Sequence, residues 1–161
     1  GLFVVDSEPG QGSTFRIYLP IESNTTTATG LTIETDRSGK DTILIIEDEQ
    51  MLRASLEETL VTQGYKVFTA VNGEQGVEVF QQHKDDITVV ICDLGLPGLS
   101  GHEVIKKIHA NRPGTRIIAT SGFMDSEALQ KLNQSGNPHI LHKPYRLAEL
   151  ISAVRSEVNG I

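Results

Sequence analysis

The run Ile87-Thr88-Val89-Val90-Ile91-Cys92-Asp93 is apolar and β-branched, and it ends in a carboxylate. Two other apolar runs end in charged residues: Thr42–Ile46 leads into Glu47-Asp48-Glu49, and His139–His142 leads into Lys143-Pro144. Short runs of this kind, bounded by turn signals, are typical of buried parallel strands. The carboxyl ends of such strands meet at one crevice of an open α/β sheet. We therefore expect these acids and the lysine to converge on a common point.

Strand and helix patterns alternate five times between residues 42 and 159. Strands are expected over 42–46, 66–70, 87–92, 115–120 and 139–142, and helices over 49–63, 73–83, 101–111, 125–135 and 146–158. Such alternation forms right-handed βαβ units. The sequence therefore predicts an α/β fold with a doubly wound five-stranded parallel sheet, flavodoxin-like strand order 2-1-3-4-5 and helices on both faces.

Two segments precede this domain, which is assigned to residues 42–161. Residues 1–20 read as a β-hairpin whose second strand alternates apolar and polar residues, which predicts one half-buried face. An isolated hairpin is only marginally stable in water, so we expect this piece to belong to a larger domain that is missing here. Residues 21–41 are rich in Thr, Ser and Gly and are expected to form a flexible linker.

Composition excludes several classes of protein. The 161 residues carry a net charge of −7, which argues against a nucleic-acid-binding surface. A single cysteine excludes a disulfide framework and a zinc cluster. No apolar stretch approaches the roughly 20 residues that span a bilayer. We expect a soluble, cytoplasmic protein segment that makes no membrane contact.

The acids at the strand ends have the composition of a magnesium site. An aspartate at the end of a strand can also simply begin a turn, but Asp93 has the pair Glu47 and Asp48 at a second strand end. Crowded carboxylates repel and need a cation, and all-oxygen ligands suit Mg²⁺. The loop after Asp93 is rich in glycine, so the backbone carbonyl of Gly95 could add a ligand.

Two further strand ends carry groups that can bind a phosphoryl oxygen. Lys143 can mark a solvated strand end, but beside a carboxylate and a metal ion its compact charge can pair with Asp93 and with a transferred phosphoryl group. Ser121, which precedes Gly122, can donate a hydrogen bond to the same group. Four strand ends thus carry an acid pair, an acid, a hydroxyl and a lysine. Together these groups form a more specific pattern than any one of them alone.

Residues 42–159 resemble the response-regulator receiver domain of two-component signalling on this pattern. The resemblance implies that Asp93 accepts a phosphoryl group from a phosphohistidine, after which the domain switches conformation. It implies that Mg²⁺ is bound by Asp48 directly and by Glu47 through water. It also implies that Lys143 and Ser121 hold the phosphoryl oxygens.

The N-terminal segment Ser7–Phe15 is similar to the last two strands of a histidine-kinase ATP-binding domain. The chain thus resembles the C-terminal part of a hybrid histidine kinase, whose parent protein can be membrane-anchored. The resemblance implies two kinds of partner: the dimerisation and phosphotransfer domain of a histidine kinase, in cis or in trans, or a histidine phosphotransfer protein. The segment itself would catalyse only its own phosphorylation and a slow dephosphorylation.

Three positions depart from the family pattern or bear on the rate of phosphate loss. Ile140 lies three residues before the lysine, where the family often has an aromatic switch residue, so coupling to Ser121 is expected to be altered. Gly95 and Phe123 lie two residues after the acceptor and two after the hydroxyl. Neither side chain can orient a hydrolytic water, which predicts slow loss of phosphate.

Other functions fit the sequence less well. A Mg²⁺-dependent aspartyl-phosphate phosphatase needs a second acid two residues after the nucleophile, where this chain has Gly95. A flavodoxin-type binding module needs a phosphate-binding loop after the first strand, where residues 47–49 would repel phosphate. A docking pseudo-receiver that is never phosphorylated is disfavoured by the complete set of acids.

Overall fold

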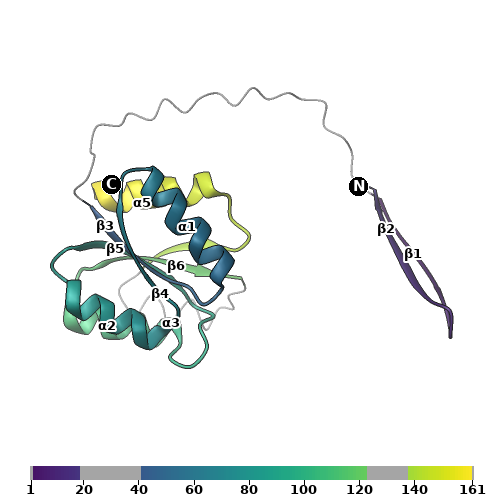
Figure 1. Ribbon diagram of the computed structural model, residues 1–161, viewed down its shortest axis with the longest axis horizontal. Helices are drawn as coiled ribbons and strands as arrows, with labels where there is room; N and C mark the ends of the chain where they lie inside the picture. The colour runs from purple at the N-terminus through teal and green to yellow at the C-terminus, as the bar shows by residue number, and fades with distance from the viewer. Residues whose placement is uncertain (1, 19–40, 123–137, 161) are drawn as a thin grey trace, which may run out of the picture. The chain divides into compact units, whose positions relative to one another are not determined.

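Five parallel strands form the sheet of the longer unit of the chain (Figure 1). They are β3 (Thr42–Ile46), β4 (Lys66–Ala70), β5 (Ile87–Asp93), β6 (Arg116–Ser121) and β7 (His139–His142). Their order across the sheet is β4-β3-β5-β6-β7, which is the predicted 2-1-3-4-5 when these five strands are counted from the first. The computed structural model describes residues 2–18, 41–122 and 138–160. The predicted fold class is confirmed.

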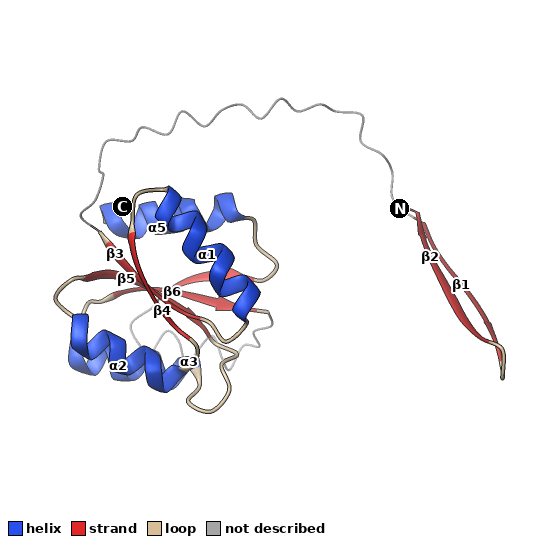
Figure 2. Ribbon diagram, in the orientation of Figure 1, coloured by secondary structure: helices blue, strands red, loops and turns tan. Residues whose placement is uncertain are grey.

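Four described helices cover the two faces of this sheet. They are α1 (Gln50–Thr62), α2 (Gly73–His83), α3 (Gly101–Asn111) and α5 (Leu147–Asn159). Each begins and ends within one residue of its predicted bounds. Figure 2 shows α1 and α5 on one side of the sheet and α2 and α3 on the other. The helix predicted over 125–135 lies outside the described residues.

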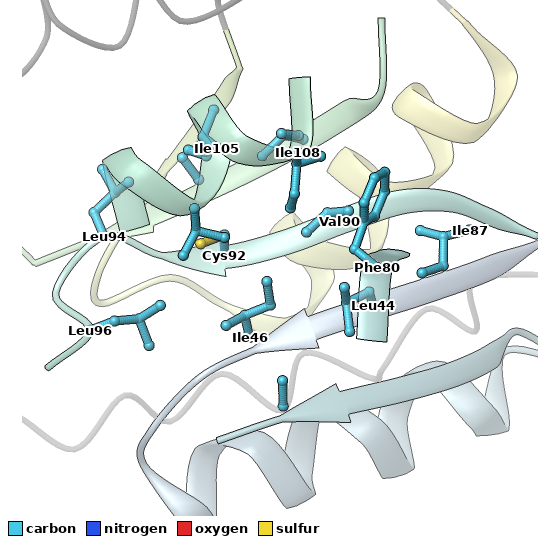
Figure 3. Close-up of a cluster of buried hydrophobic side chains, with 14 residues drawn as sticks. Leu44, Ile46, Phe80, Ile87, Val90, Cys92, Leu94, Leu96, Ile105 and Ile108 are labelled. Carbon is cyan, nitrogen blue, oxygen red and sulfur yellow. The ribbon is translucent and has the colours of Figure 1, made fainter. Parts of the chain in front are cut away.

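The alternation of side chains along the central strands builds two separate cores. Ile43 and Ile45 of β3 point toward α1 and α5, where they pack with residues such as Leu56 and Val154. Leu44 and Ile46 point the other way and belong to a buried cluster with Phe80 of α2 and Ile105 of α3, all four of which are labelled in Figure 3. Every residue of β3 is buried, because the strand is covered on both faces. The sheet therefore provides a rigid platform for whatever lies at its strand ends.

A glycine brings the start of α3 against the acceptor strand. A Cβ atom at Gly101 would overlap with the carbonyl oxygen of Asp93, so only a glycine fits at this position. The helix is fixed there by a capping box in which Ser100 and Glu103 bond reciprocally. The loop that begins at Asp93 therefore returns to pack against the same residue.

The N-terminal unit is an antiparallel hairpin of β1 (Leu2–Glu8) and β2 (Gly12–Tyr18). Phe3 pairs with Ile17 and Val5 pairs with Phe15, so these four apolar side chains share one face. The half-buried face predicted from the sequence is not observed: Phe15 and Ile17 are 64% and 67% exposed. A two-stranded sheet has no second layer of its own to cover either face, which explains their exposure.

Two further predictions concern the linker and membrane-spanning segments. The linker predicted over 21–41 lies outside the described residues except for Asp41. Within the described part of the chain, no helix combines the length and the apolar character needed to cross a bilayer.

Candidate functional site

The predicted site residues lie at one end of the sheet because their strands are parallel. Glu47 and Asp48 follow β3, Asp93 ends β5, Ser121 ends β6 and Lys143 follows β7. The sheet is thus the reason that residues almost a hundred positions apart in the sequence meet. Glu47, Asp93 and Ser121 are buried, with 3%, 8% and 4% exposure, whereas Asp48 is exposed.

Lys143 connects two of the carboxylates. Its Nζ atom donates to Asp93 Oδ2 at 2.7 Å and to Glu47 Oε2 at 2.9 Å. The backbone helps to hold it there, because the N–H of Lys143 donates to the carbonyl of Ser121 at 2.7 Å. The peptide bond between Lys143 and Pro144 is cis. The predicted pairing of the lysine with the acceptor is thus present in the structure.

The electrostatics of this trio follow from its burial. Burial raises the pKa of the Glu47 carboxyl, and the neighbouring Asp93 adds to the rise, although the hydrogen bond from Lys143 opposes it. Burial lowers the pKa of the Lys143 ammonium, but its hydrogen bonds to Asp93 and Glu47 outweigh that effect, so the pKa is raised. The lysine therefore stays charged at neutral pH.

The three acids are close enough to share a cation. Glu47, Asp48 and Asp93 each offer a carboxylate oxygen, and these oxygens lie within 4.8 Å of one another. One ammonium cannot neutralise three carboxylates. Oxygen-only donors, with neither histidine nor cysteine among them, suit a hard cation such as Mg²⁺. The residues present therefore fit the predicted metal.

The loop after the acceptor contributes its backbone. The N–H of Gly95 donates to Asp93 Oδ1 at 3.0 Å, so both oxygens of the acceptor carboxylate have a donor. A Cβ atom at Gly95 would lie 3.7 Å from Asp93 Oδ1, so the position is open beside the acceptor. Ser121 is brought to the same end of the sheet by its pairing with His142 in β7. Phe123 lies outside the described residues.

One residue at the site was not predicted. The Nη1 atom of Arg53 donates to the carbonyl oxygen of Glu47 at 2.7 Å and to that of Asp48 at 3.2 Å. An arginine at the fourth residue of a helix that follows the acidic run Glu47–Glu49 is the sequence signal that could have indicated it. A cation is disfavoured at that end of a helix, so its presence needs an explanation.

Comparison with known proteins identifies the family. The family model described as "Response regulator receiver domain" matches residues 43–155. The chain belongs to this family. Receiver domains are the phosphoacceptor domains of two-component signalling, and they bind Mg²⁺ at an acidic pocket.

Individual relatives agree with this assignment. The chain is 27% identical to the sensor kinase CckA of Brucella abortus over 164 residues, which cover 96% of this chain and 17% of the kinase. It is 27% identical to sporulation initiation phosphotransferase F of Bacillus subtilis, over 70% of this chain and 90% of that protein. A crystal structure of a receiver domain protein from Clostridium thermocellum matches with a TM-score of 0.70 and 28% identity, covering 74% of this chain and 95% of that one. The match to the sensor kinase thus includes almost all of this receiver chain, but the chain spans less than a fifth of the length of the kinase.

Proposed function

We propose that Asp93 of this receiver domain accepts a phosphoryl group from a phosphohistidine in a phosphorelay. The observation that carries the proposal is the pair of contacts made by Lys143, which donates to Asp93 at 2.7 Å and to Glu47 at 2.9 Å. A buried acceptor, a charged donor beside it and two further acids are the components that phosphoryl transfer requires.

The proposed step needs little covalent chemistry from the protein. A carboxylate oxygen of Asp93 attacks phosphorus in line, and the bond between phosphorus and the imidazole nitrogen of the donor breaks. The electron pair of that bond returns to the imidazole. The ammonium of Lys143 and the hydroxyl of Ser121 then hold phosphoryl oxygens, because negative charge is spread over these oxygens in the transition state.

A magnesium ion would be held by the same carboxylates. Asp48 and Asp93 are the proposed direct ligands, with the carbonyl of Gly95, and Glu47 acts through water. When bound, Mg²⁺ neutralises charge on the acceptor and on the phosphoryl oxygens.

Phospho-Asp93 is expected to lose its phosphate slowly. The position two residues after the acceptor is a glycine, which lacks any side chain to orient a hydrolytic water. A half-life of only seconds in Mg²⁺ buffer would contradict this expectation.

We further propose that the domain is the C-terminal part of a hybrid histidine kinase. Residues 1–20 would complete the ATP-binding domain, residues 21–41 would be a flexible linker and residues 42–161 would be the receiver. The similarity to a sensor kinase over 96% of this chain supports the proposal, as does the exposed apolar face of the hairpin. The partners would be a histidine kinase phosphotransfer domain, in cis or in trans, or a histidine phosphotransfer protein, in the cytoplasm.

Labelling with acetyl phosphate tests the acceptor assignment without any partner protein. The wild-type chain in Mg²⁺ buffer should gain one acid-stable but alkali-labile phosphoryl group, and Asp93→Asn should gain none. Asp85→Asn is the matched control, because Asp85 is an exposed aspartate in the turn before the other end of β5. Labelling of Asp93→Asn at the wild-type rate would overturn the proposal. Phosphotransfer profiling against candidate histidine donors would then identify the partner.

A further inference from the structure

We propose that Arg53 is a positioning residue of the phosphoacceptor site, where its guanidinium fixes the loop that presents Asp48 to the divalent cation. The inference rests on the proposed function, because it assigns a role within that site. Its basis is the pair of hydrogen bonds from Arg53 Nη1 to the carbonyl oxygens of Glu47 and Asp48, at 2.7 and 3.2 Å.

These two carbonyls define the geometry of Asp48. Each carbonyl oxygen belongs to a planar peptide unit, one on either side of the Asp48 Cα atom. Holding both units fixes the backbone dihedrals of Asp48 and hence the direction of its Cα–Cβ bond. The side chain of Asp48 is exposed, whereas Glu47 is buried and paired with Lys143. Asp48 therefore depends on its backbone for orientation more than the other two acids do.

The position of Arg53 in its helix is unfavourable for the helix itself. The N-terminus of a helix carries partial positive charge, and Arg53 is only the fourth residue of α1, so its cation lies near an unfavourable end. The first turn of α1 contains no acidic residue, and Glu49 at the N-cap makes no capping hydrogen bond through its side chain. The side chain of Glu47 accepts from the ammonium of Lys143 and, at 3.4 Å, from the N–H of Glu49 at this N-cap. The guanidinium of Arg53 thus makes its contacts with Glu47 and Asp48 in the loop before the helix.

Charge and position predict opposite effects when Arg53 is removed. Loss of a positive charge near three carboxylates would by itself strengthen binding of a divalent cation. Loss of the two hydrogen bonds would release Asp48 and weaken binding. The direction of the change in Mg²⁺ affinity therefore separates the two roles.

Arg112 provides a matched control at the opposite end of the sheet. Its Nη1 atom also donates to two backbone carbonyls, those of Lys84 and, at 2.9 Å, Ile87. Ile87 is the first residue of β5 and Asp93 is the last, so this clamp is a strand length away from the acceptor. Arg112→Met removes the same kind of interaction and the same charge without touching the acid loop.

The experiment is a Mg²⁺ titration of the full chain, followed by NMR and by the rate of labelling with acetyl phosphate. In Arg53→Met the half-saturating Mg²⁺ concentration should rise about tenfold, as for other partners that orient metal ligands. At saturating Mg²⁺ the labelling rate should return toward that of the wild type, because Asp93 and Lys143 are intact. Arg53→Lys keeps the charge with fewer donors. Its half-saturating Mg²⁺ concentration should lie between those of the wild type and Arg53→Met. Arg112→Met should titrate as the wild type does.

Three results would overturn the role of Arg53. One is unchanged or tighter Mg²⁺ binding in Arg53→Met, and another is an equal loss in Arg112→Met. If Arg53→Met does not fold, unchanged Mg²⁺ affinity in Arg53→Lys is the third. Failure of the proposed function looks different, because the wild-type chain itself would then neither bind Mg²⁺ nor become labelled.

Discussion

The charged side chains at the two ends of the same sheet have different kinds of partner. At the amino end, Arg112 and Arg116 donate to backbone carbonyls at strand and helix ends, where carbonyl groups are left over from the regular hydrogen-bond pattern. At the carboxyl end, three carboxylates lie close together, and the ammonium of Lys143 pairs with two of them. We therefore expect these contacts at the amino end to contribute to stability. The carboxyl end is left with excess negative charge, which a bound cation can neutralise.

Among variants that keep the acceptor Asp93, the largest effect is expected from Lys143→Met at the carboxyl end. The change removes the donor that contacts Asp93 and is proposed to hold the phosphoryl group. Loss of one such donor typically lowers the rate about 100-fold. The initial rate of acetyl phosphate labelling at saturating Mg²⁺ measures it, with Lys107→Met on the exposed face of α3 as the control. A wild-type rate in Lys143→Met would contradict the assignment.

A side chain at position 95 should change the lifetime of phospho-Asp93. The position has room for one beside the acceptor, since a Cβ atom there would lie 3.7 Å from Asp93 Oδ1. The amide of Gly95→Asn can orient an attacking water, so hydrolysis should accelerate severalfold, whereas Gly95→Ala should leave it slow. The decay of labelled protein after removal of the donor provides the measurement. Equal lifetimes in the Asn and Ala variants would count against this explanation.

Glu47→Gln should change how stability depends on pH. The pKa of Glu47 is higher in the folded protein than in the unfolded chain, so the folded protein binds the proton more tightly. Its contribution therefore favours folding at low pH and is lost as the pH rises through the raised pKa. Without Mg²⁺, the free energy of unfolding of the wild type should fall relative to Glu47→Gln across that range. Urea unfolding at a series of pH values tests this, and parallel pH curves would contradict it.

The smallest effect on function is expected at the amino end. Arg116 donates to the carbonyl oxygens of Glu157 and Val158 near the end of α5, the second at 2.8 Å. Arg116→Met should lower the free energy of unfolding by about 1.5–3 kcal/mol, the usual contribution of hydrogen bonds made by charged groups. Labelling of Asp93 at a temperature where the variant is folded should be unchanged. A slower labelling rate would show that the two ends are not independent.

The sequence predicted the site residues whose place at the end of a strand is enough to bring them into the site. Glu47, Asp48, Asp93 and Lys143 each follow an apolar run directly, so a parallel sheet alone brings them together. Arg53 could not be predicted in this way, because its role depends on a side chain folding back onto two carbonyls. The exposed face of the hairpin was also missed, since alternation in a strand indicates a face that can be covered without showing what covers it.

A Mg²⁺ titration of the isotope-labelled chain, followed residue by residue by NMR, tests the central claim most directly. If the acids at the carboxyl end share one cation, shifts should saturate together at Glu47, Asp48, Asp93, Gly95 and Lys143. The amino end, including Ile87 and Arg116, should not respond. Absent shifts, or shifts scattered over exposed acids elsewhere, would contradict a single magnesium site.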